Sequence, residues 1–325
     1  MSAPPAPADP VGPSLARWCE RASLRGLPVW AVAFSAGADS TALLCAAHTR
    51  WPGQVVALHV HHGLQTAADG FETMARQTCE SLGVRLRVRR LDASPEAGQS
   101  PEDAAREHRY RALAQMACEA GAGCVLLGQH ADDQVETLML ALGRGAGPPG
   151  LAGMAERFER HGMLFGRPLL DLPAPALRAW LRDLGQPWAE DPSNADPRFT
   201  RNRIRRTLLP AWEAAFPGFR TTVPRSMRHV AQAQRLLAEL AGIDLATTGT
   251  PPAIASLQGL SRERQANALR HWLRGQEGVA PSEAQLDELL DQVAACRTRG
   301  HAIRLKVADG FVLREGSRLR YTRPV

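Results

Sequence analysis

The chain contains almost no lysine. Lys306 is its only lysine among 39 basic residues, and the others are all arginines. A Walker-type phosphate loop requires a lysine directly after its second glycine, so the sequence excludes that class of nucleotide-binding protein. Because Lys306 lies near the far end of the chain, a lysine Schiff base in the N-terminal part is excluded as well.

Cysteine is scarce and is not arranged for metal binding. None of the six cysteines forms a Cys-x-x-Cys pair, and the nearest two, Cys118 and Cys124, are too loosely spaced for a usual zinc or cluster motif. We interpret the cysteines at positions 19, 45, 79, 118, 124 and 296 as buried thiols in a reducing compartment.

Long apolar runs are missing too. No stretch approaches the roughly 20 residues that a membrane-spanning helix needs. Residues 1–13 are rich in proline and alanine and carry no basic residue, which favours a flexible lead-in over a secretory signal peptide. We therefore expect a cytoplasmic protein, and its 325 residues predict two domains.

The charge is unevenly divided along the chain. Residues 1–200 carry a net charge of −3 and residues 201–325 one of +9, which together give the net charge of +6. Such asymmetry often marks a half that binds nucleic acid. A solvated arginine-rich surface is the alternative, and charge alone does not decide between the two.

Strand-like and helix-like segments alternate over the first two hundred residues. The expected strands are 29–34, 55–60, 85–90 and 124–127, and the expected helices are 39–48, 70–82, 102–120 and 133–142. This order predicts an α/β fold with a doubly wound, Rossmann-like parallel sheet. A ligand then belongs at the carboxyl ends of the strands.

The pattern changes beyond residue 210. Helices are expected over 226–240, 261–274 and 281–295, and two or three short strands over 302–321. We therefore expect a flexible lead-in over 1–20, a nucleotide-binding domain over 21–215, and a linker helix with a smaller basic α+β domain over 216–325.

The most informative segment is the loop Ser35-Ala36-Gly37-Ala38-Asp39-Ser40, which follows a strand and opens a helix. Unpaired backbone amides and a helix N-terminus favour an anion at such a point. Ser35 and Ser40 can donate to phosphate, whereas Asp39 would repel it unless a cation lies between. The loop thus predicts a Mg²⁺-bound nucleotide polyphosphate. The alternative is an ordinary strand-to-helix turn rich in small residues.

This loop resembles the Ser-Gly-Gly-x-Asp-Ser signature of the PP-loop ATP pyrophosphatases, with Ala36 in place of a glycine. If the position requires a positive φ, alanine is strained there. If it requires only a small side chain, the replacement is mild.

Two further segments end at the same sheet edge or open a nearby helix. His59, His61 and His62 follow the second expected strand, and we favour histidines lining a nucleotide pocket over a metal site, because no carboxylate or thiol is adjacent. Arg106 and Arg109 lie one turn apart with Tyr110, either in surface ion pairs or directed at phosphates.

A second strand-to-helix turn runs from Gly128 through His130, Asp132 and Asp133 to Glu136. Carboxylates at a helix start can be simple capping groups. Beside a phosphate loop they can instead hold Mg²⁺ or a cationic substrate.

Three more segments carry residues that could form the site. Residues 143–151, which contain Arg144, hold four glycines and two prolines, and we expect a mobile loop without regular structure. Residues 190–194 end in Asn194, and residues 201–205 hold Arg201, Asn202, Arg203 and Arg205. These two segments read either as a turn and a basic helix start or as substrate contacts.

Together these motifs resemble the tRNA(Ile)-lysidine synthetase family of PP-loop enzymes. The resemblance covers about residues 29–210. It includes Ser-x-Gly-x-Asp-Ser (35–40), His-His-Gly-Leu (61–64), Arg-x-x-Arg-Tyr (106–110), Asp-Asp-Gln-x-Glu-Thr (132–137), Arg-Gly-x-Gly-Pro-x-Gly-Leu (144–151), Arg-Pro-Leu-Leu (167–170), Glu-Asp-Pro-Ser-Asn (190–194) and Arg-Asn-Arg-Ile-Arg (201–205). Residues after 215 match only loosely, like the small C-terminal domain of short members.

The resemblance implies ATP-dependent attachment of free L-lysine to C2 of the wobble cytidine in a CAU-anticodon isoleucine tRNA, through an adenylated cytidine. It implies ATP and Mg²⁺ as cofactors and a homodimer. The implied cofactor-binding residues are Ser35, Ala36, Gly37, Ala38, Asp39, Ser40, His59, His61, Gly128 and His130, with Asp39 as the Mg²⁺ ligand. The implied catalytic residues are Asp39, Asp133, Glu136 and Arg109, and the implied tRNA or substrate contacts are Arg106, Arg144, Asn194, Arg201, Asn202, Arg203 and Arg205.

Two rival functions remain to be weighed against this one. A PP-loop tRNA thiolase would need paired cysteines, which the chain lacks. A tRNA-binding protein with a decayed ATP loop is suggested by Ala36, but the intact Ser35, Asp39 and Asp133 argue against decay.

Overall fold

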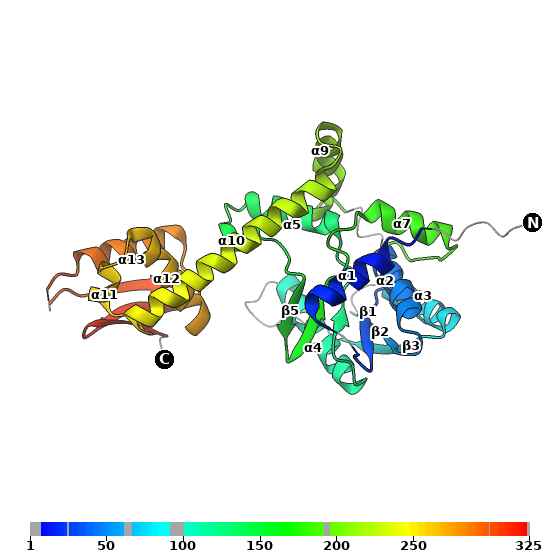
Figure 1. Cartoon of the computed structure of the whole chain (residues 1–325), viewed down its shortest axis with the longest axis horizontal. Coiled ribbons are helices and arrows are strands. Elements are labelled where there is room, and N and C mark those ends of the chain that lie inside the picture. Colours follow the sequence, from blue (N-terminus) through cyan, green and yellow to red (C-terminus); the bar gives the residue numbers. More distant parts are fainter. Residues whose placement is uncertain are drawn as a thin grey trace, which may run out of the picture. The chain divides into compact units, whose positions relative to one another are not determined.

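A computed structural model describes residues 8–24, 26–61, 67–91, 101–191, 196–298 and 300–323, without the side chains of residues 67, 68 and 101–103. The chain divides into two compact units, Met1–His229 and Val230–Val325 (Figure 1). The division falls inside the long helix α10 (Phe219–Thr248), so one helix contributes to both units.

The first unit is built on a six-stranded sheet in the order β3-β2-β1-β4-β6-β5. Its strands are β1 (Trp30–Ala33), β2 (Val55–His61), β3 (Arg85–Arg90), β4 (Val125–Leu126), β5 (Arg157–Arg160) and β6 (Met163–Gly166). Every pair is parallel except the β5–β6 hairpin. The expected parallel α/β sheet is therefore confirmed.

Helices cover both faces of this sheet because its central strands are apolar on both sides. Trp30, Val32 and Phe34 face the cluster formed with α1 (Val11–Ala22), α2 (Ala38–Arg50), α3 (Ala67–Leu82) and α7 (Ala174–Asp183). Ala31 and Ala33 face the cluster formed with α4 (Pro101–Glu119). The alternation follows from the two-residue period of a strand.

Several segments differ from the sequence-based expectation, which did not include α7 or the short helix that begins at Ile254. Helix α1 lies largely within the expected lead-in over 1–20, yet Val11, Leu15 and Trp18 are buried in the core. The β5–β6 hairpin was not expected. Within residues 143–151, Pro148–Leu151 form the short helix α6, so the expectation of no regular structure was wrong there, since proline suits the first turn of a helix.

A helical segment connects the sheet to α10. It comprises α5 (Ala131–Leu142), then α8 (Thr200–Arg203), the π-helix η2 (Ile204–Leu208) and α9 (Leu209–Ala215). Val135 of α5 packs with Ile204 and with Phe219, Val223 and Met227 of α10. The start of α10 is thereby fixed to the helix that opens at Ala131.

The second unit is a small α+β domain, as expected. Helices α11 (Ile254–Gln258), α12 (Arg262–Gln276) and α13 (Glu283–Ala295) accompany an antiparallel sheet of β7 (Arg304–Val307), β8 (Gly310–Glu315) and β9 (Arg318–Thr322). Trp272, Leu289 and Val312 are central to its core. Among the described residues, no helix has the length and hydrophobicity required to cross a membrane.

Candidate active site

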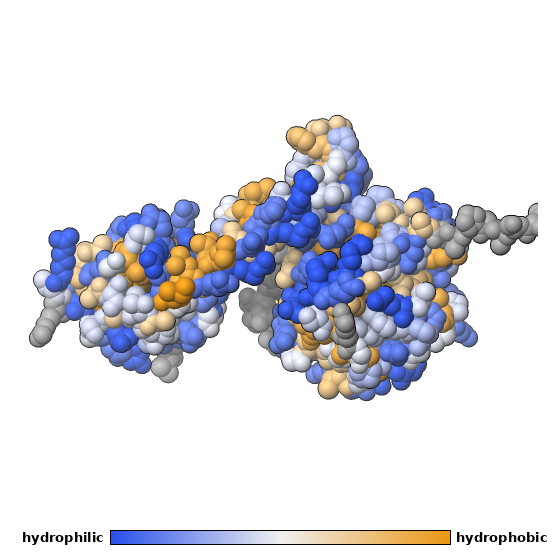
Figure 2. Space-filling view, viewed as in Figure 1, coloured by the Kyte–Doolittle hydropathy of each residue, from blue (hydrophilic) through white to orange (hydrophobic). Residues whose placement is uncertain are grey.

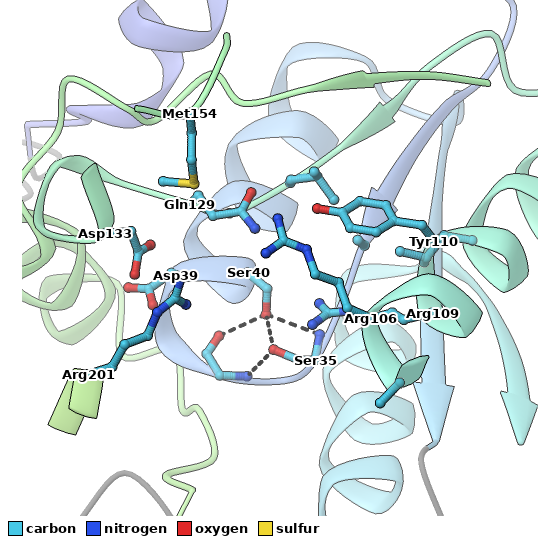
Figure 3. Close-up of a pocket in the computed structure, with 16 residues that line it drawn as sticks. Ser35, Asp39, Ser40, Arg106, Arg109, Tyr110, Gln129, Asp133, Met154 and Arg201 are labelled. Atoms are coloured by element: carbon cyan, nitrogen blue, oxygen red, sulfur yellow. Dashed lines mark hydrogen bonds between the residues drawn. The ribbon is translucent and has the colours of Figure 1, made fainter. Parts of the chain in front are cut away.

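Two strand-to-helix turns meet at the carboxyl edge of the sheet. β1 leads through residues 34–37 into α2, and its parallel neighbour β4 leads through residues 127–130 into α5. Gly128 allows the close approach, because a Cβ atom there would lie 3.1 Å from both the Asp39 carbonyl carbon and the Ser40 nitrogen. The helix N-termini of α2 and α5 thus open beside one cleft of about 420 Å³ (Figure 3).

The first turn is held by its own hydroxyl groups. The Oγ atoms of Ser35 and Ser40 lie 3.1 Å apart, and Ser40 Oγ donates to the Gly37 carbonyl at 3.0 Å. Thr41 Oγ1 donates to the same carbonyl at 2.9 Å. The N-cap of α2 is Gly37, which has no side chain, so no N-cap side chain accepts from the first amides of this helix. The turn has the form expected of an anion site.

Ala36 adopts a left-handed conformation with φ of 65°. Its side chain is fully buried and its carbonyl accepts a hydrogen bond from the Ala189 N–H at 2.8 Å. Of the two alternatives for this position, the structure therefore shows the strained one, since an L-residue with a Cβ atom pays for positive φ where glycine does not.

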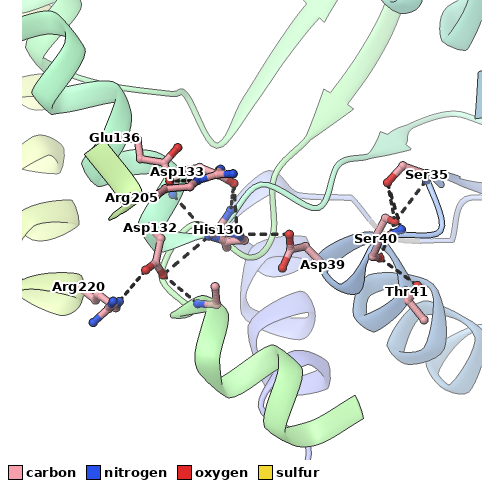
Figure 4. A network of polar contacts seen from close by, with 12 residues as sticks. Ser35, Asp39, Ser40, Thr41, His130, Asp132, Asp133, Glu136, Arg205 and Arg220 are labelled. Atoms are coloured by element: carbon pink, nitrogen blue, oxygen red, sulfur yellow. Dashed lines mark hydrogen bonds and ion pairs between the residues drawn. The ribbon is translucent and has the colours of Figure 1, made fainter. Parts of the chain in front are cut away.

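His130 links the two turns (Figure 4). Its Nε2 lies 3.4 Å from Asp39 Oδ2 and 3.6 Å from Asp133 Oδ2, and its backbone N–H donates to Asp133 Oδ2 at 3.1 Å. Burial favours the neutral imidazole, but the surrounding carboxylates outweigh burial and raise the pKa of His130 to about 9. Burial likewise opposes the Asp39 carboxylate, yet its contact with His130 leaves the pKa of Asp39 lowered. Asp39 is therefore ionised at neutral pH.

Asp39 also fits a magnesium ligand. Its Oδ1 atom is buried and has no hydrogen-bond partner among the described residues. A carboxylate oxygen that faces a phosphate loop in this state matches what Mg²⁺ requires of a protein ligand.

The acidic residues that open α5 are paired with arginines from later in the chain. Arg205 of η2 contacts Glu136 Oε1 and lies 3.2 Å from Asp133 Oδ1, and Arg220 of α10 donates to Asp132 Oδ1 at 2.6 Å. Burial raises the pKa of Glu136, and Arg205 only partly opposes it. An arginine guanidinium thus pairs with Glu136, one of the two carboxylates that the sequence suggested for a cationic substrate, whereas Asp133 also lines the cleft.

The cleft has a cationic side and an anionic side. Arg106, Arg109 and Tyr110 of α4 line it opposite Asp39 and Asp133, as Figure 3 shows. Burial alone would raise the pKa of the Tyr110 hydroxyl, but Arg167 and Arg106 outweigh it and lower that pKa. The α4 side therefore suits phosphate, while the carboxylates on the other side lie beside Arg201.

The expected site residues separate into three groups. Lining the cleft are Ser35, Gly37, Asp39, Ser40, Arg106, Arg109, Gly128, Asp133 and Arg201. Supporting it from behind are Ala36, His130, Glu136 and Arg205. Outside its lining lie Ala38, His59, His61, Arg144, Asn202 and Arg203. Asn194 and His62 lie outside the described residues.

The residues outside the lining have other partners. His59 Nδ1 lies 2.8 Å from the Phe34 carbonyl, and His61 Nε2 lies 3.2 Å from Asp69 Oδ1. Asn202 is buried and donates to the Asp196 carbonyl at 2.8 Å. These three side chains therefore hold neighbouring segments together outside the lining of the cleft.

Sequence reasoning missed several lining residues, namely Ala33, Ala105, Leu113, Leu127, Gln129 and Met154. The apolar ones read as ordinary core. Gln129 stood inside a recognised motif, and its position directly after Gly128 was the available signal.

Comparisons with known proteins agree with this geometry. A family model described as a PP-loop domain matches residues 15–212, and one described as the TilS substrate binding domain matches residues 253–320. The tRNA(Ile)-lysidine synthase of Polaromonas naphthalenivorans is 58% identical over 90% of this chain and 88% of its own length. The same-named enzyme of Ralstonia nicotianae is 43% identical over 85% of this chain, which spans 61% of that longer relative.

Among solved structures, the U34-tRNA thiolase NcsA from Methanococcus maripaludis superposes with a TM-score of 0.57 at 16% identity, covering 68% of this chain and 78% of that one. At this identity the likeness concerns the fold alone.

The strain at Ala36 leads to a first prediction. Replacing Ala36→Gly should raise the free energy of unfolding by about 0.5–1 kcal/mol, because relief of positive-φ strain exceeds the added entropy of the unfolded chain. Ala46→Gly, in the interior of α2, should instead lower it by about 1 kcal/mol. Urea unfolding followed by tryptophan fluorescence measures both. Destabilisation by both substitutions would contradict the account.

The pairing of Glu136 with Arg205 leads to a second. Arg205→Met should lower the free energy of unfolding at pH 7 by about 2 kcal/mol, less than for a fully buried pair because 36% of the Arg205 side chain is exposed. Because the folded-state pKa of Glu136 is raised, ionisation of this carboxyl destabilises the fold. This cost is absent below the unfolded-state pKa of Glu136 and grows as the pH rises toward the folded-state pKa. The deficit should therefore shrink between pH 7 and pH 5.

Arg203→Met, at an exposed position on α8, is the matched control for unfolding at both pH values. Equal deficits for the two variants, or a deficit for Arg205→Met that grows on acidification, would show that Arg205 does not stabilise the Glu136 carboxylate.

Proposed function

The chain belongs to the tRNA(Ile)-lysidine synthase family and is an ATP-using ligase that modifies tRNA, and we propose that it forms lysidine by way of an adenylated cytidine. The acceptor is the wobble cytidine of an isoleucine tRNA with a CAU anticodon, and the second substrate is free L-lysine. The observation that carries the proposal is the cleft that Asp133 and residues of the Ser35–Ser40 turn, Asp39 among them, line together.

In the first step, O2 of the cytidine attacks the α-phosphorus of ATP, and the bond to the bridging oxygen of pyrophosphate breaks. The turn of residues 35–40 binds the departing pyrophosphate at the N-terminus of α2, and Arg106 and Arg109 face it from α4. Asp39 would hold Mg²⁺, which neutralises the charge of the leaving group. His130 keeps the Asp39 carboxylate ionised and oriented.

In the second step, the neutral ε-amine of lysine attacks C2 of the adenylated cytidine. The C2–O2 bond breaks, AMP departs with the electron pair, and the amine loses its proton. Asp133 lines the cleft and is placed to bind the amine or accept that proton. Glu136 is fully buried behind it and acts through its pairing with Arg205.

The second unit supplies tRNA recognition in this proposal. The segment matched by the substrate binding domain lies in the basic part of the chain, where arginines complement phosphates. We assign to it the discrimination against methionine tRNAs with the same anticodon, through the acceptor arm or overall shape.

Lysine incorporation tests this function directly. Labelled L-lysine should be retained on a CAU-anticodon isoleucine tRNA transcript in the presence of ATP and Mg²⁺, and far less on a methionine tRNA transcript. Asp39→Asn should reduce the rate by about 100-fold or more, because Mg²⁺ loses its carboxylate ligand and the charge of the departing pyrophosphate is no longer neutralised. Asp183→Asn, exposed on α7, is the matched control.

Incorporation that does not require ATP, or that survives in the Asp39→Asn variant at the control rate, would contradict the proposal. So would retention of lysine on both tRNAs at equal rates, since the second unit would then not discriminate.

We also propose a homodimer. Leu236 and Ile243 of α10 are 59% and 63% exposed, and Leu237 is partly exposed beside them. Figure 2 shows the apolar patch over the C-terminal half of this helix. Two copies that bury this face should sediment at twice the chain mass of 35.2 kDa, and Leu236→Glu should shift the population to monomer. A wild-type monomer at micromolar concentration would contradict the dimer.

A further inference from the structure

Arg167 opens the Arg-Pro-Leu-Leu segment, to which the mechanism above assigns no part. It follows β6 directly, and its side chain is buried, with 5% of the residue exposed. The guanidinium lies 4.3 Å above the Phe158 ring, and Nη1 donates to the Ala155 carbonyl at 2.8 Å. Nε donates to Gln129 Oε1 at 3.1 Å. A buried arginine is thus held by the hairpin and interacts with two cleft residues, Gln129 and Tyr110.

This contact determines which end of the Gln129 amide faces the cleft. A guanidinium carries only donors, so the atom of Gln129 that it contacts must be the oxygen. The NH₂ group is therefore turned away from Arg167. Because Gln129 itself lines the cleft, as Figure 3 shows, this group is a donor available to a ligand.

The surroundings indicate what the donor meets. A Cβ atom on Gly128, the preceding residue, would lie 3.1 Å from the backbone of Asp39 and Ser40, and Arg106 lines the same cleft. An NH₂ donor whose carbonyl is bound by a buried cation is polarised toward an anionic oxygen. Adenylation places growing negative charge on the α-phosphoryl oxygens beside the pyrophosphate site.

We propose that Gln129 donates a hydrogen bond to an α-phosphoryl oxygen of ATP during adenylation, and that Arg167 is the positioning residue that holds its amide in that orientation. This inference rests on the proposed function and adds to it a donor that stabilises the transition state. It also gives a role to a buried arginine beside a cleft that is already lined by Arg106, Arg109 and Arg201.

The test uses single-turnover adenylation of isoleucine tRNA at saturating ATP, with ATP affinity measured separately. Gln129→Leu should slow adenylation by about 10- to 100-fold and change the ATP dissociation constant by less than about threefold, as expected for a contact made mainly in the transition state. Gln129→Glu should be slower still, because one carboxylate oxygen pairs with Arg167 and the other faces the phosphate. Gln77→Glu, exposed on α3, is the matched control.

Arg167 is tested through its dependence on Gln129. Arg167→Gln should slow adenylation by about 10-fold in the wild-type background and by less than about twofold in the Gln129→Leu background, because the two residues act through one amide. Arg167→Lys, which keeps a charged donor, should recover part of the rate and covers the case in which Arg167→Gln does not fold.

Several results would overturn the inference. Unchanged adenylation in Gln129→Leu would show that Gln129 does not donate to the α-phosphate. An effect confined to the KM for tRNA would show that the amide contacts the cytidine base and not ATP. Multiplying effects of the two substitutions would make Arg167 independent of Gln129. Each of these leaves the proposed function standing, provided that the wild-type chain adenylates the tRNA. Failure of the wild type to do so overturns both.

Discussion

The site depends on the close parallel pairing of β1 and β4. Two neighbouring parallel strands necessarily deliver their following helices to the same edge, and Gly128 lets those helix starts touch. The contacts between the starts of α2 and α5 follow from this proximity. The phosphate-binding turn lies on α2, the acidic residues lie on α5, and His130 spans the gap of a few ångströms between Asp39 and Asp133.

The charges around that junction are balanced from distant parts of the chain. Asp132, Asp133 and Glu136 would repel one another and a nucleotide, but Arg205 and Arg220 neutralise them from η2 and α10. Arg220 and Asp132 also join the start of α10 to the start of α5, in addition to the packing of Phe219 and Val135. The linker helix is therefore part of the architecture of the active site.

The sequence predicted the parallel sheet and both turns well because local signals specified them. Apolar runs ending in small or acidic residues mark strand-to-helix turns, and the topology rules then place those turns together. The state of Ala36 could not be read from sequence, since the same residue fits a mild or a strained conformation. Its φ of 65° is a property of the folded loop.

Contacts across long sequence separations were also out of reach. Arg205 was expected to contact tRNA or phosphate, but it pairs with carboxylates 69 and 72 residues earlier in the chain. The orientation of Gln129 depends on Arg167, which is 38 residues away on a hairpin that was not expected. Helix α1 was missed because its proline-rich beginning resembles a lead-in, whereas its buried face is specified by packing against the sheet.

A crystal structure with a non-hydrolysable ATP analogue and Mg²⁺ is the measurement that tests the central claim most directly. The account predicts the terminal phosphates on the amides of residues 35–40, the metal between them and Asp39, and the α-phosphate next to Gln129. A nucleotide bound away from this turn, or bound in it with the metal held by other residues, would contradict the account.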